Sequence, residues 1–243
     1  MTTLVLSSRH SEDNQALWRA AIRRPWSVVR VRGITLPPLT DDDIVLYVEA
    51  LLAPTIAAGL SHRLLSPADD WLPSLPDALT QRTIRLTTLG AARTLTTPQF
   101  VKPPNDKLFT ARVFASGGDL PGDFADDLPV LTADPMVWSV EFRCFCLDQC
   151  VRTISPYLRN GVHARHTDYS ASDDELQHAI DLATRVLRLE DVATPRAIVI
   201  DVGRLETGEW AVVEANSAWG SGIYGCDPNQ VLDVVRQATV PIS

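Results

Sequence analysis

The chain has 243 residues, of which 45% are hydrophobic, and carries a formal net charge of −8 at pH 7. This length and hydrophobic content are sufficient for one large domain or two small ones, each with a real core. The negative charge argues against a nucleic acid as the main partner, because binding to a phosphate backbone depends on concentrated Lys and Arg. A nucleotide needs only a local basic pocket and is not excluded.

The sequence also argues against a membrane protein. The apolar run near the N-terminus is too short for a signal peptide. The longest apolar stretch, residues 44–60, is interrupted by Glu49 and Pro54 and is not suited to span a bilayer. We therefore expect a cytoplasmic protein that does not contact a membrane.

The four cysteines fit that compartment. Three of them cluster in a CxCxxxC pattern, which lacks the paired CxxC spacing of structural zinc sites. We expect the clustered residues to be buried free thiols, since two of them lie on the packed face of a predicted strand. The cysteines are Cys144, Cys146, Cys150 and Cys226.

Strands and helices are predicted to alternate in the first part of the chain. Strands are expected at residues 3–7, 27–32 and 43–48. A helix over 12–24 ends at Pro25, and an Ala- and Leu-rich helix follows the third strand. This alternation indicates a small, mainly parallel α/β unit. A helical pattern then resumes from about residue 77 to residue 95.

From residue 98 the pattern changes to short strands, a loop-rich passage and long hairpins. The loop-rich passage covers residues 124–135, and the helix expected over 170–189 begins with a capping box from Ser172 to Glu175. Strands followed by a helix and further strands predict an α+β region next to the α/β unit. The remaining elements are expected to be strands at 99–103, 111–115, 137–147 and 151–158, a hairpin over 197–216 and a final helix near 230–238.

The hairpin over 197–216 carries three oxygen ligands that suit a metal. A turn centred between Thr207 and Gly208 would place Asp201 opposite Glu214, and Asn216 shares the face of Glu214. Two carboxylates that close repel each other unless a cation sits between them. Few hard oxygen ligands with open positions suit Mg²⁺ carrying a nucleotide phosphate. The alternative is a surface hairpin whose polar residues face solvent.

Further charged side chains lie on the preceding strands. Lys102 lies inside an apolar strand and Lys107 at the following turn, where both could hold phosphates or simply extend to solvent. Glu141, Arg143 and Phe145 share one face of a long strand by period two. The Glu could accept from ribose hydroxyls and the Arg could clamp a phosphoryl group or a carboxylate, or the two could neutralise each other.

The order of these residues, Lys…Lys…ExR…D…ExN, resembles the ATP-grasp superfamily over essentially the whole chain. "VEFRCFCLDQ" is similar to the nucleotide-strand motif of peptide-ligating members, and "DVGRLETGEWAVVEANSAWGSGIYG" is most similar to the two-arginine-one-lysine clade. The resemblance implies an α+β ATP-grasp fold. A pre-ATP-grasp α/β domain would cover residues 1–96 and an ATP-grasp domain residues 97–243, with a smaller lobe at 97–137 and a larger lobe at 138–243.

The resemblance also implies roles for individual residues. Lys102 would be the phosphate or adenine-side lysine, with Lys107 as a second contact, and Glu141 would bind the ribose. Arg143 would be one of the two named arginines. The second is expected to be Arg159, with Arg152 as the alternative. The magnesium ligands would be Asp201, Glu214 and Asn216.

One segment differs from the superfamily pattern, and the role of two histidines stays open. The turn "PPNDKLFT" contains no glycine where a flexible Gly-rich flap would cover the phosphates, while "SGGDLPG", residues 116–122, supplies glycines one strand later. His163 and His166 could act as a base or bind substrate, or they could be solvated loop histidines.

The function implied by the resemblance is ATP-dependent ligation of a carboxylate to an amine through an acyl phosphate. ATP and Mg²⁺ would be required, and the partners would be small-molecule or peptide carboxylates and amines. A homodimer is compatible with the resemblance, since ATP-grasp ligases are often dimeric. The alternatives are a small-molecule kinase that shares the ATP site and a nucleotide-binding module without catalysis.

Overall fold

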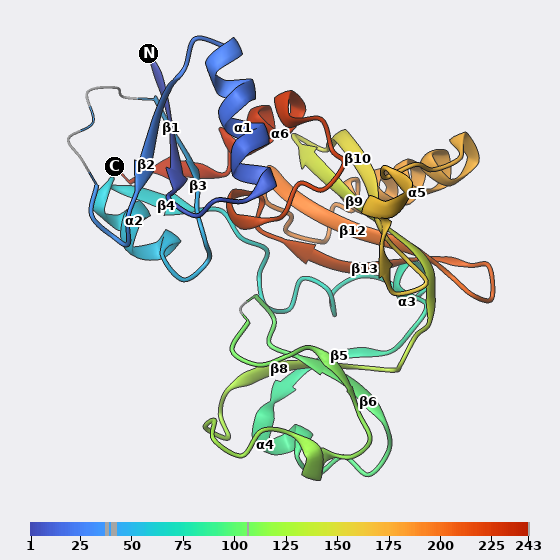
Figure 1. Ribbon diagram of the computed structural model, residues 1–243. Coiled ribbons are helices and arrows are strands. Elements are labelled where there is room, and N and C mark those ends of the chain that lie inside the picture. Colours follow the sequence, from blue (N-terminus) through green and yellow to red (C-terminus); the bar gives the residue numbers. More distant parts are fainter. Residues whose placement is uncertain (37–38, 40–42, 106, 243) are drawn as a thin grey trace.

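The computed structural model describes residues 1–36, 39, 43–105 and 107–242. Three sheets with their helices make up most of the molecule (Figure 1). The predicted α+β class is confirmed by this arrangement. No helix among the described residues is both long and apolar enough to cross a membrane.

The N-terminal unit is a parallel sheet with helices. Its strand order is β2-β1-β3, and both pairings are parallel, as the alternation of elements predicted. Strand β4 pairs antiparallel with β14 near the other end of the chain. The elements are β1 (Thr2–Ser7), α1 (Glu12–Arg23), β2 (Ser27–Val31), β3 (Asp43–Tyr47), α2 (Ala53–Gly59), β4 (His62–Leu64) and β14 (Thr239–Pro241).

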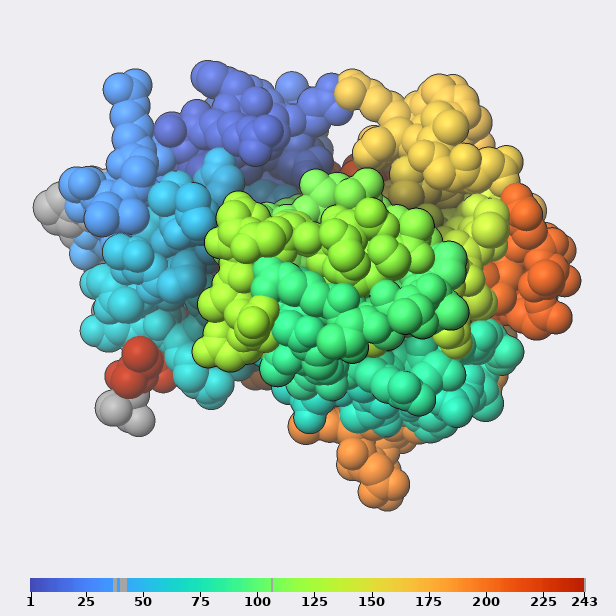
Figure 2. Space-filling model, turned by 90° about the horizontal axis from the view of Figure 1, so that it is seen from below, coloured from blue at the N-terminus to red at the C-terminus, as the bar shows by residue number. Residues whose placement is uncertain are grey.

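The small lobe is an antiparallel sheet of order β5-β8-β6-β7. Phe114, Val101 and Val130 form its core with helix α4. Figure 2 shows this lobe, in green, in front of the rest of the molecule. The elements here are β5 (Ile84–Thr88), α4 (Leu89–Ala92), β6 (Gln99–Lys102), β7 (Arg112–Phe114), the 3-10 helix η1 (Gly117–Asp119) and β8 (Pro129–Ala133). Helix α3 (Asp77–Thr80) precedes them and packs against strand β13 (Trp210–Asn216) of the large lobe.

Two sequence predictions were wrong in this lobe. The helix expected over 77–95 is interrupted by β5, and the loop-rich passage 124–135 contains β8. Strand β8 is central, with β5 on one side and β6 on the other. These pairings join residues 29 to 49 positions apart, so a local pattern does not contain them. The predicted boundary at residue 96 stays a prediction, and β5, which precedes it, pairs within the small-lobe sheet.

The large lobe is an antiparallel sheet of order β11-β10-β9-β12-β13. Helix α5 covers one face and begins with the predicted capping box from Ser172 to Glu175. Helix α6 packs against the opposite face and also against α1. The elements are β9 (Trp138–Leu147), β10 (Cys150–Arg159), β11 (Val162–His163), η2 (Ala164–Thr167), α5 (Asp173–Leu187), β12 (Ala197–Leu205), β13 (Trp210–Asn216), η3 (Ala218–Gly220) and α6 (Pro228–Val235).

Period-two alternation in β9 and β12 decides what each face of the large sheet carries. Phe142, Cys144 and Ile200 enter the apolar core beneath α5. Phe145 and Val199 point to the other face and join the core of the N-terminal unit. The predicted burial of the thiols is confirmed for Cys144 and Cys146, whereas Cys150 is exposed at the hairpin; Cys226 is buried and all four are free.

Candidate active site

The charged residues of the large sheet meet because its strands are in register. Asp201 on β12 lies opposite Arg143 on β9 and opposite Glu214 on β13. The predicted facing of Asp201 and Glu214 is therefore confirmed. Glu141 and Arg143 lie on the same face, next to the apolar residues that contact the N-terminal unit. We call this charged face the floor of the site.

Asp201 and Arg143 form a buried ion pair on the floor. The Asp201 side chain is 0% exposed and that of Arg143 is 8% exposed. Arg143 donates from Nε to Oδ1 at 2.9 Å and from Nη2 to Oδ2 at 2.6 Å. Burial by itself would lower the pKa of Arg143, but the charge and hydrogen bonds of Asp201, together with the two neighbouring tyrosines, hold it well above its usual value. The arginine is therefore fixed in position and permanently charged.

Glu214 is balanced by a lysine from the small lobe. Lys102, at the end of β6, donates a hydrogen bond to Glu214 and forms an ion pair with it. Burial alone would raise the pKa of Glu214, but the Lys102 charge and the Asn216 hydrogen bond lower it to about 2. Asn216 donates from Nδ2 to Glu214 at 2.9 Å and to Asp201 at 3.2 Å.

The repulsion expected between the two carboxylates is thus already offset by groups of the protein. Lys102, Arg143 and the Asn216 amide supply the positive charge and the donors. Among the described residues, no three His, Cys, Asp or Glu side chains gather as a metal site. An ion held here would have only the two carboxylates and the amide oxygen of Asn216 as protein ligands.

Glu141 lies on the same face but does not line either of the two larger cavities beside the floor. It is 9% exposed and accepts a hydrogen bond from the Tyr157 hydroxyl at 2.7 Å. Burial raises the pKa of Glu141 to about 7, although the Tyr157 hydrogen bond opposes this. Its predicted ribose contact stays a prediction, since the carboxyl group lies beneath Tyr157.

Two aromatic rings that the sequence reasoning missed hold the guanidinium of Arg143. Its carbon Cζ lies 5.2 Å from the centre of the Tyr157 ring and 4.9 Å from that of Tyr224. The two rings stack with centroids 5.2 Å apart. Tyr157 lies at an ordinary strand position. Tyr224 lies after β13 with a φ of 48°, in the Gly-Ile-Tyr-Gly end of the segment that resembles the clade, but nothing in the sequence related either tyrosine to Arg143.

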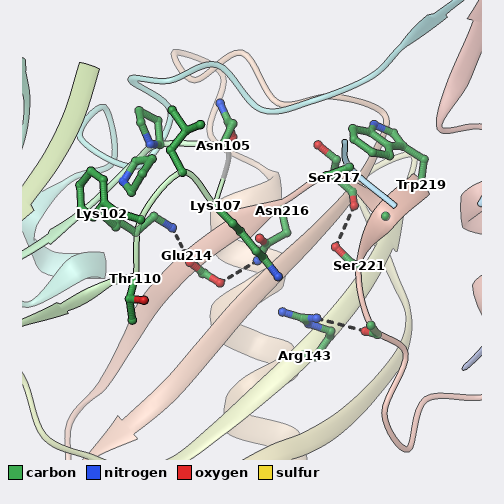
Figure 3. Close-up of a pocket in the computed structure, with 18 of the residues that line it drawn as sticks. Lys102, Asn105, Lys107, Thr110, Arg143, Glu214, Asn216, Ser217, Trp219 and Ser221 are labelled. Carbon is green, nitrogen blue, oxygen red and sulfur yellow. Dashed lines mark hydrogen bonds and ion pairs between the residues drawn. The ribbon is translucent and has the colours of Figure 1, made fainter. Parts of the chain in front are cut away.

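A cavity of about 620 Å³ opens above the floor (Figure 3). Arg143, Glu214 and Asn216 line it from the large sheet. The β6–β7 hairpin lines it from the small lobe, and Figure 3 shows Lys102 and Lys107 reaching toward the floor. We call the described residues of this hairpin between Lys102 and Ala111 the roof; residue 106 of the predicted glycine-free turn lies outside the described residues.

Two side chains of the roof, Asn105 and Phe109, attach it to neighbouring segments. Asn105 donates from Nδ2 to the carbonyl of Pro67 at 3.0 Å and to Asp69 at 2.6 Å. Phe109 packs against Phe114 and Phe124, with ring centroids 6.4 and 5.9 Å away. Lys107 lines the cavity and is exposed.

A second, more apolar cavity of about 260 Å³ shares Lys102 and Glu214 with the first. It lies between the small lobe and β13, and Phe100, Leu131 and Trp138 line it. Arg82 forms one wall, donating to the carbonyls of Val212 at 2.9 Å and Val213 at 2.8 Å. Sequence reasoning missed Arg82 because residues 77–95 were expected to be helical.

Several predicted residues lie away from both cavities. Arg159 pairs with Glu175 through two hydrogen bonds of 2.8 Å and lines neither cavity; Arg152 is exposed. His163 and His166 are exposed, and His163 lies 5.3 Å from the Tyr224 ring centre. The catalytic role predicted for Arg159 therefore has no support from its position.

The glycines of residues 116–122 have a packing role in this structure. Segment 117–119 forms η1 with a capping box between Ser116 and Asp119. A Cβ at Gly117 would lie 2.3 Å from the backbone of Arg93, so only glycine fits. These residues do not line the large cavity.

Comparison with known proteins identifies the fold. The chain is similar in structure to a RimK domain ATP-grasp protein from Sphaerobacter thermophilus DSM 20745, with a TM-score of 0.57, 15% identity and coverage of 97% of this chain and 99% of that one. It is also similar to N5-carboxyaminoimidazole synthase from Aspergillus clavatus in complex with ADP and 5-aminoimidazole ribonucleotide, with a TM-score of 0.54, 12% identity and coverage of 98% and 78%. D-cycloserine synthetase gives a TM-score of 0.53 at 11% identity, with coverage of 97% and 99%.

No curated protein matches the sequence. The family model that does match describes an ATP-grasp domain of the two-arginine-one-lysine clade, family 2, and it covers residues 79–234, more than half of the chain. These residues include every charged residue of the floor and most of those that line the two cavities. The chain therefore belongs to the ATP-grasp superfamily, in the two-arginine-one-lysine clade.

Proposed function

We propose that this protein is an ATP-dependent ligase that joins a carboxylate to an amine through an acyl phosphate. The observation that carries the proposal is the pairing of floor and roof. Cationic Lys102, Lys107 and Arg143 line one cavity together with Glu214 and Asn216. In an ATP-grasp fold, this arrangement suits a nucleotide whose phosphates lie between the two lobes.

The two cavities suggest how the nucleotide is oriented. The apolar cavity lined by Phe100, Leu131 and Trp138 fits a base, which buries a flat apolar surface. Lys102 belongs to both cavities, so phosphates that leave the base cavity would pass its ammonium group and enter the larger cavity. Arg143 lies there, with its position fixed by Asp201.

The donor set on the floor fits magnesium, because it consists of two carboxylates and one amide oxygen. Glu214 and Asn216 face the cavity and would hold the ion, while Asp201, the third predicted ligand, is bound to Arg143 and Asn216 in this structure. When bound, the ion would neutralise charge on the β- and γ-phosphates. Lys102 would then turn from Glu214 to the phosphates.

The chemistry of the proposal is two displacements. A carboxylate oxygen of the acid attacks the γ-phosphorus, the bond to the β-γ bridging oxygen breaks, and ADP leaves. The amine then attacks the acyl carbon, the carbon–oxygen bond to phosphate breaks, and inorganic phosphate leaves as the amine loses a proton. Arg143 would stabilise negative charge that develops on the phosphoryl and acyl oxygens. Its tyrosine neighbours and Asp201 keep it aligned for this task.

ADP release and hydroxylamine trapping test the proposal. Purified protein with MgATP and a panel of carboxylic acids and amino acids should release ADP only when its acid is present. Adding hydroxylamine should convert the acyl phosphate to a hydroxamate. Arg188→Ala, a change at an exposed residue outside both cavities, is the matched control and should behave as the parent protein does.

The outcomes separate the candidate functions. Hydroxamate formation supports the ligase. Release of ADP with a phosphorylated product, no hydroxamate and no need for an amine would make the protein a kinase. Binding of an ATP analogue without turnover across the panel would favour a binding module, and no binding at all would refute the nucleotide site.

A further inference from the structure

The loop after β13, residues 217–224, forms a wall of the large cavity and is held by the N-terminal unit. Ser217, Trp219 and Tyr224 line the cavity from this loop. The backbone N–H of Val48, just after β3, donates to the carbonyl of Trp219 at 3.3 Å. The loop therefore runs along the carboxyl end of the parallel sheet, where β3 ends. We call it the wall loop.

Two consecutive peptide units of the wall loop are bound by three side chains. The Tyr47 hydroxyl donates to the carbonyl of Ser221 at 2.8 Å, and Ile223 donates its N–H to Asp13 Oδ2 at 3.1 Å. Between them, the carbonyl of Gly222 accepts from Arg143 Nη1 at 3.1 Å. Two of these side chains belong to the N-terminal unit, on β3 and α1, and the third is the arginine of the floor.

This arrangement fixes the third contact of the Arg143 guanidinium. Asp201 binds Nε and Nη2, and the Gly222 carbonyl adds the hydrogen bond to Nη1. The Gly222 carbonyl and the Ile223 N–H belong to one planar peptide unit, so Asp13 fixes the orientation of that carbonyl directly. Tyr47 holds the preceding peptide unit. Tyr47 is 7% exposed, so its hydroxyl relies on partners within the protein, the Ser221 carbonyl and the side chain of Asp13.

We propose that Tyr47 and Asp13 are positioning residues for Arg143, acting through the wall loop, so that the N-terminal unit is part of the catalytic machinery and not only a scaffold. The proposal rests on the proposed function for its kinetic consequence. Its structural consequence, a change in the environment of Arg143, does not depend on which reaction the protein catalyses.

The first test is the ¹⁵N–¹H NMR signal of the Arg143 Nε–H group, assigned by its absence in Arg143→Lys. Tyr47→Phe and Asp13→Ala remove one anchor each. Both should shift this signal and speed its exchange with water, since the guanidinium loses its fixed third contact. Asp13→Asn keeps an oxygen that can accept from Ile223 N–H, and it should restore the signal toward that of the parent protein.

A matched control separates positioning from lost stability. Ile56 is fully buried in α2, in the same core as Tyr47, and does not line the cavity. Ile56→Val destabilises the N-terminal unit about as much as loss of one hydrogen bond does. It should leave the Arg143 signal unchanged.

The kinetic arm uses the acid and amine found in the ADP assay. Tyr47→Phe should lower turnover about tenfold, the usual effect of one lost hydrogen bond, while the dissociation constant of an ATP analogue changes less than about twofold. Ile56→Val should change neither. If Tyr47→Phe and Asp13→Ala leave the Arg143 signal as it is, or if Ile56→Val moves it equally, the proposal is wrong. If no acid or amine gives ADP, the proposed function fails, and the NMR result still decides this inference.

Discussion

The floor and the roof of the large cavity hold their charges in different ways. On the floor, Asp201 is 0% exposed and both of its oxygens are bound by Arg143. On the roof, Lys107 is exposed. A buried charged group keeps its position because moving it would leave its partner unpaired. An exposed charged group can move, because water solvates it wherever it points. The floor is therefore preorganised, and the roof is the side that adapts to a ligand.

The largest effect is expected from breaking the buried pair of the floor. Asp201→Asn should lower the free energy of unfolding by about 3–5 kcal/mol, because Arg143 stays buried with a neutral partner. Asp148 provides a matched control, since it forms a similar two-bond pair with Arg196 at 2.9 Å, but at an exposed hairpin. Asp148→Asn should cost less than about 1 kcal/mol.

Urea unfolding followed by circular dichroism measures both variants. Equal losses would mean that burial does not distinguish the two pairs, and the contrast between floor and roof would lose its basis. If Asp201 and Glu214 were two carboxylates without partners, they would repel each other, and neutralising one of them would aid folding. The structure supplies Lys102 and Arg143 as partners, so either carboxylate is now part of an ion pair.

The second prediction concerns the geometry of Arg143. Arg143→Lys keeps the charge but loses the planar fork that binds Asp201 and Gly222 together. Turnover should fall about a hundredfold, equivalent to about 3 kcal/mol, while the affinity for an ATP analogue changes little. Steady-state ADP release and isothermal titration calorimetry report the two effects separately. Equal losses in both would make Arg143 a nucleotide anchor.

The floor was more predictable from the sequence than the small-lobe sheet. Alternation with period two placed Glu141 and Arg143 on one face, and the turn length set Asp201 opposite Glu214. These relations are local to two hairpins. By contrast, β8 lies between strands distant in sequence, so β5 and β8 were misread as part of a helix and a loop, although β6 and β7 were predicted as strands.

Residues that contact the site from distant parts of the sequence could not be predicted either, because a local pattern does not record such contacts. Tyr157 is a typical strand residue until the fold places it over Arg143, and Arg82 acts on β13 from 130 positions away. Arg159 was chosen by its place on the returning strand, but the capping residue Glu175 of α5 binds it instead. The N-terminal contacts of Asp13 and Tyr47 give no pattern in the sequence at all.

A third prediction uses the pH dependence of Glu141 on the floor. Burial raises its pKa from 4.5 to about 7, so the folded state holds the proton better than the unfolded state does. The resulting stability is fully present below pH 4.5 and is lost as the pH rises through about 7. Glu141→Gln cannot ionise, and its amide oxygen can still accept from Tyr157.

The variant should therefore keep stability that the parent protein loses between about pH 4.5 and pH 8, by at most about 3 kcal/mol. Thermal unfolding of both proteins across this range gives the difference in stability at each pH. The contributions of the other titrating groups are the same in both proteins and cancel in this difference. Parallel curves would show that folding does not raise the pKa of Glu141.

The smallest effects are expected on the roof, where two lysines differ in their partners. Lys102 contacts Glu214, and Lys107 is exposed. Lys102→Met should weaken binding of an ATP analogue about tenfold, because the nucleotide would meet Glu214 without its partner. Lys107→Met should weaken it only about two- to threefold, as for a solvated charge.

Raising the salt concentration from about 0.05 to about 0.5 M shortens the screening length and should abolish the Lys107 effect while most of the Lys102 effect persists. Calorimetric titrations at the two salt concentrations measure both, and a Lys107 effect as large and as resistant to salt as that of Lys102 would show that the roof is as preorganised as the floor.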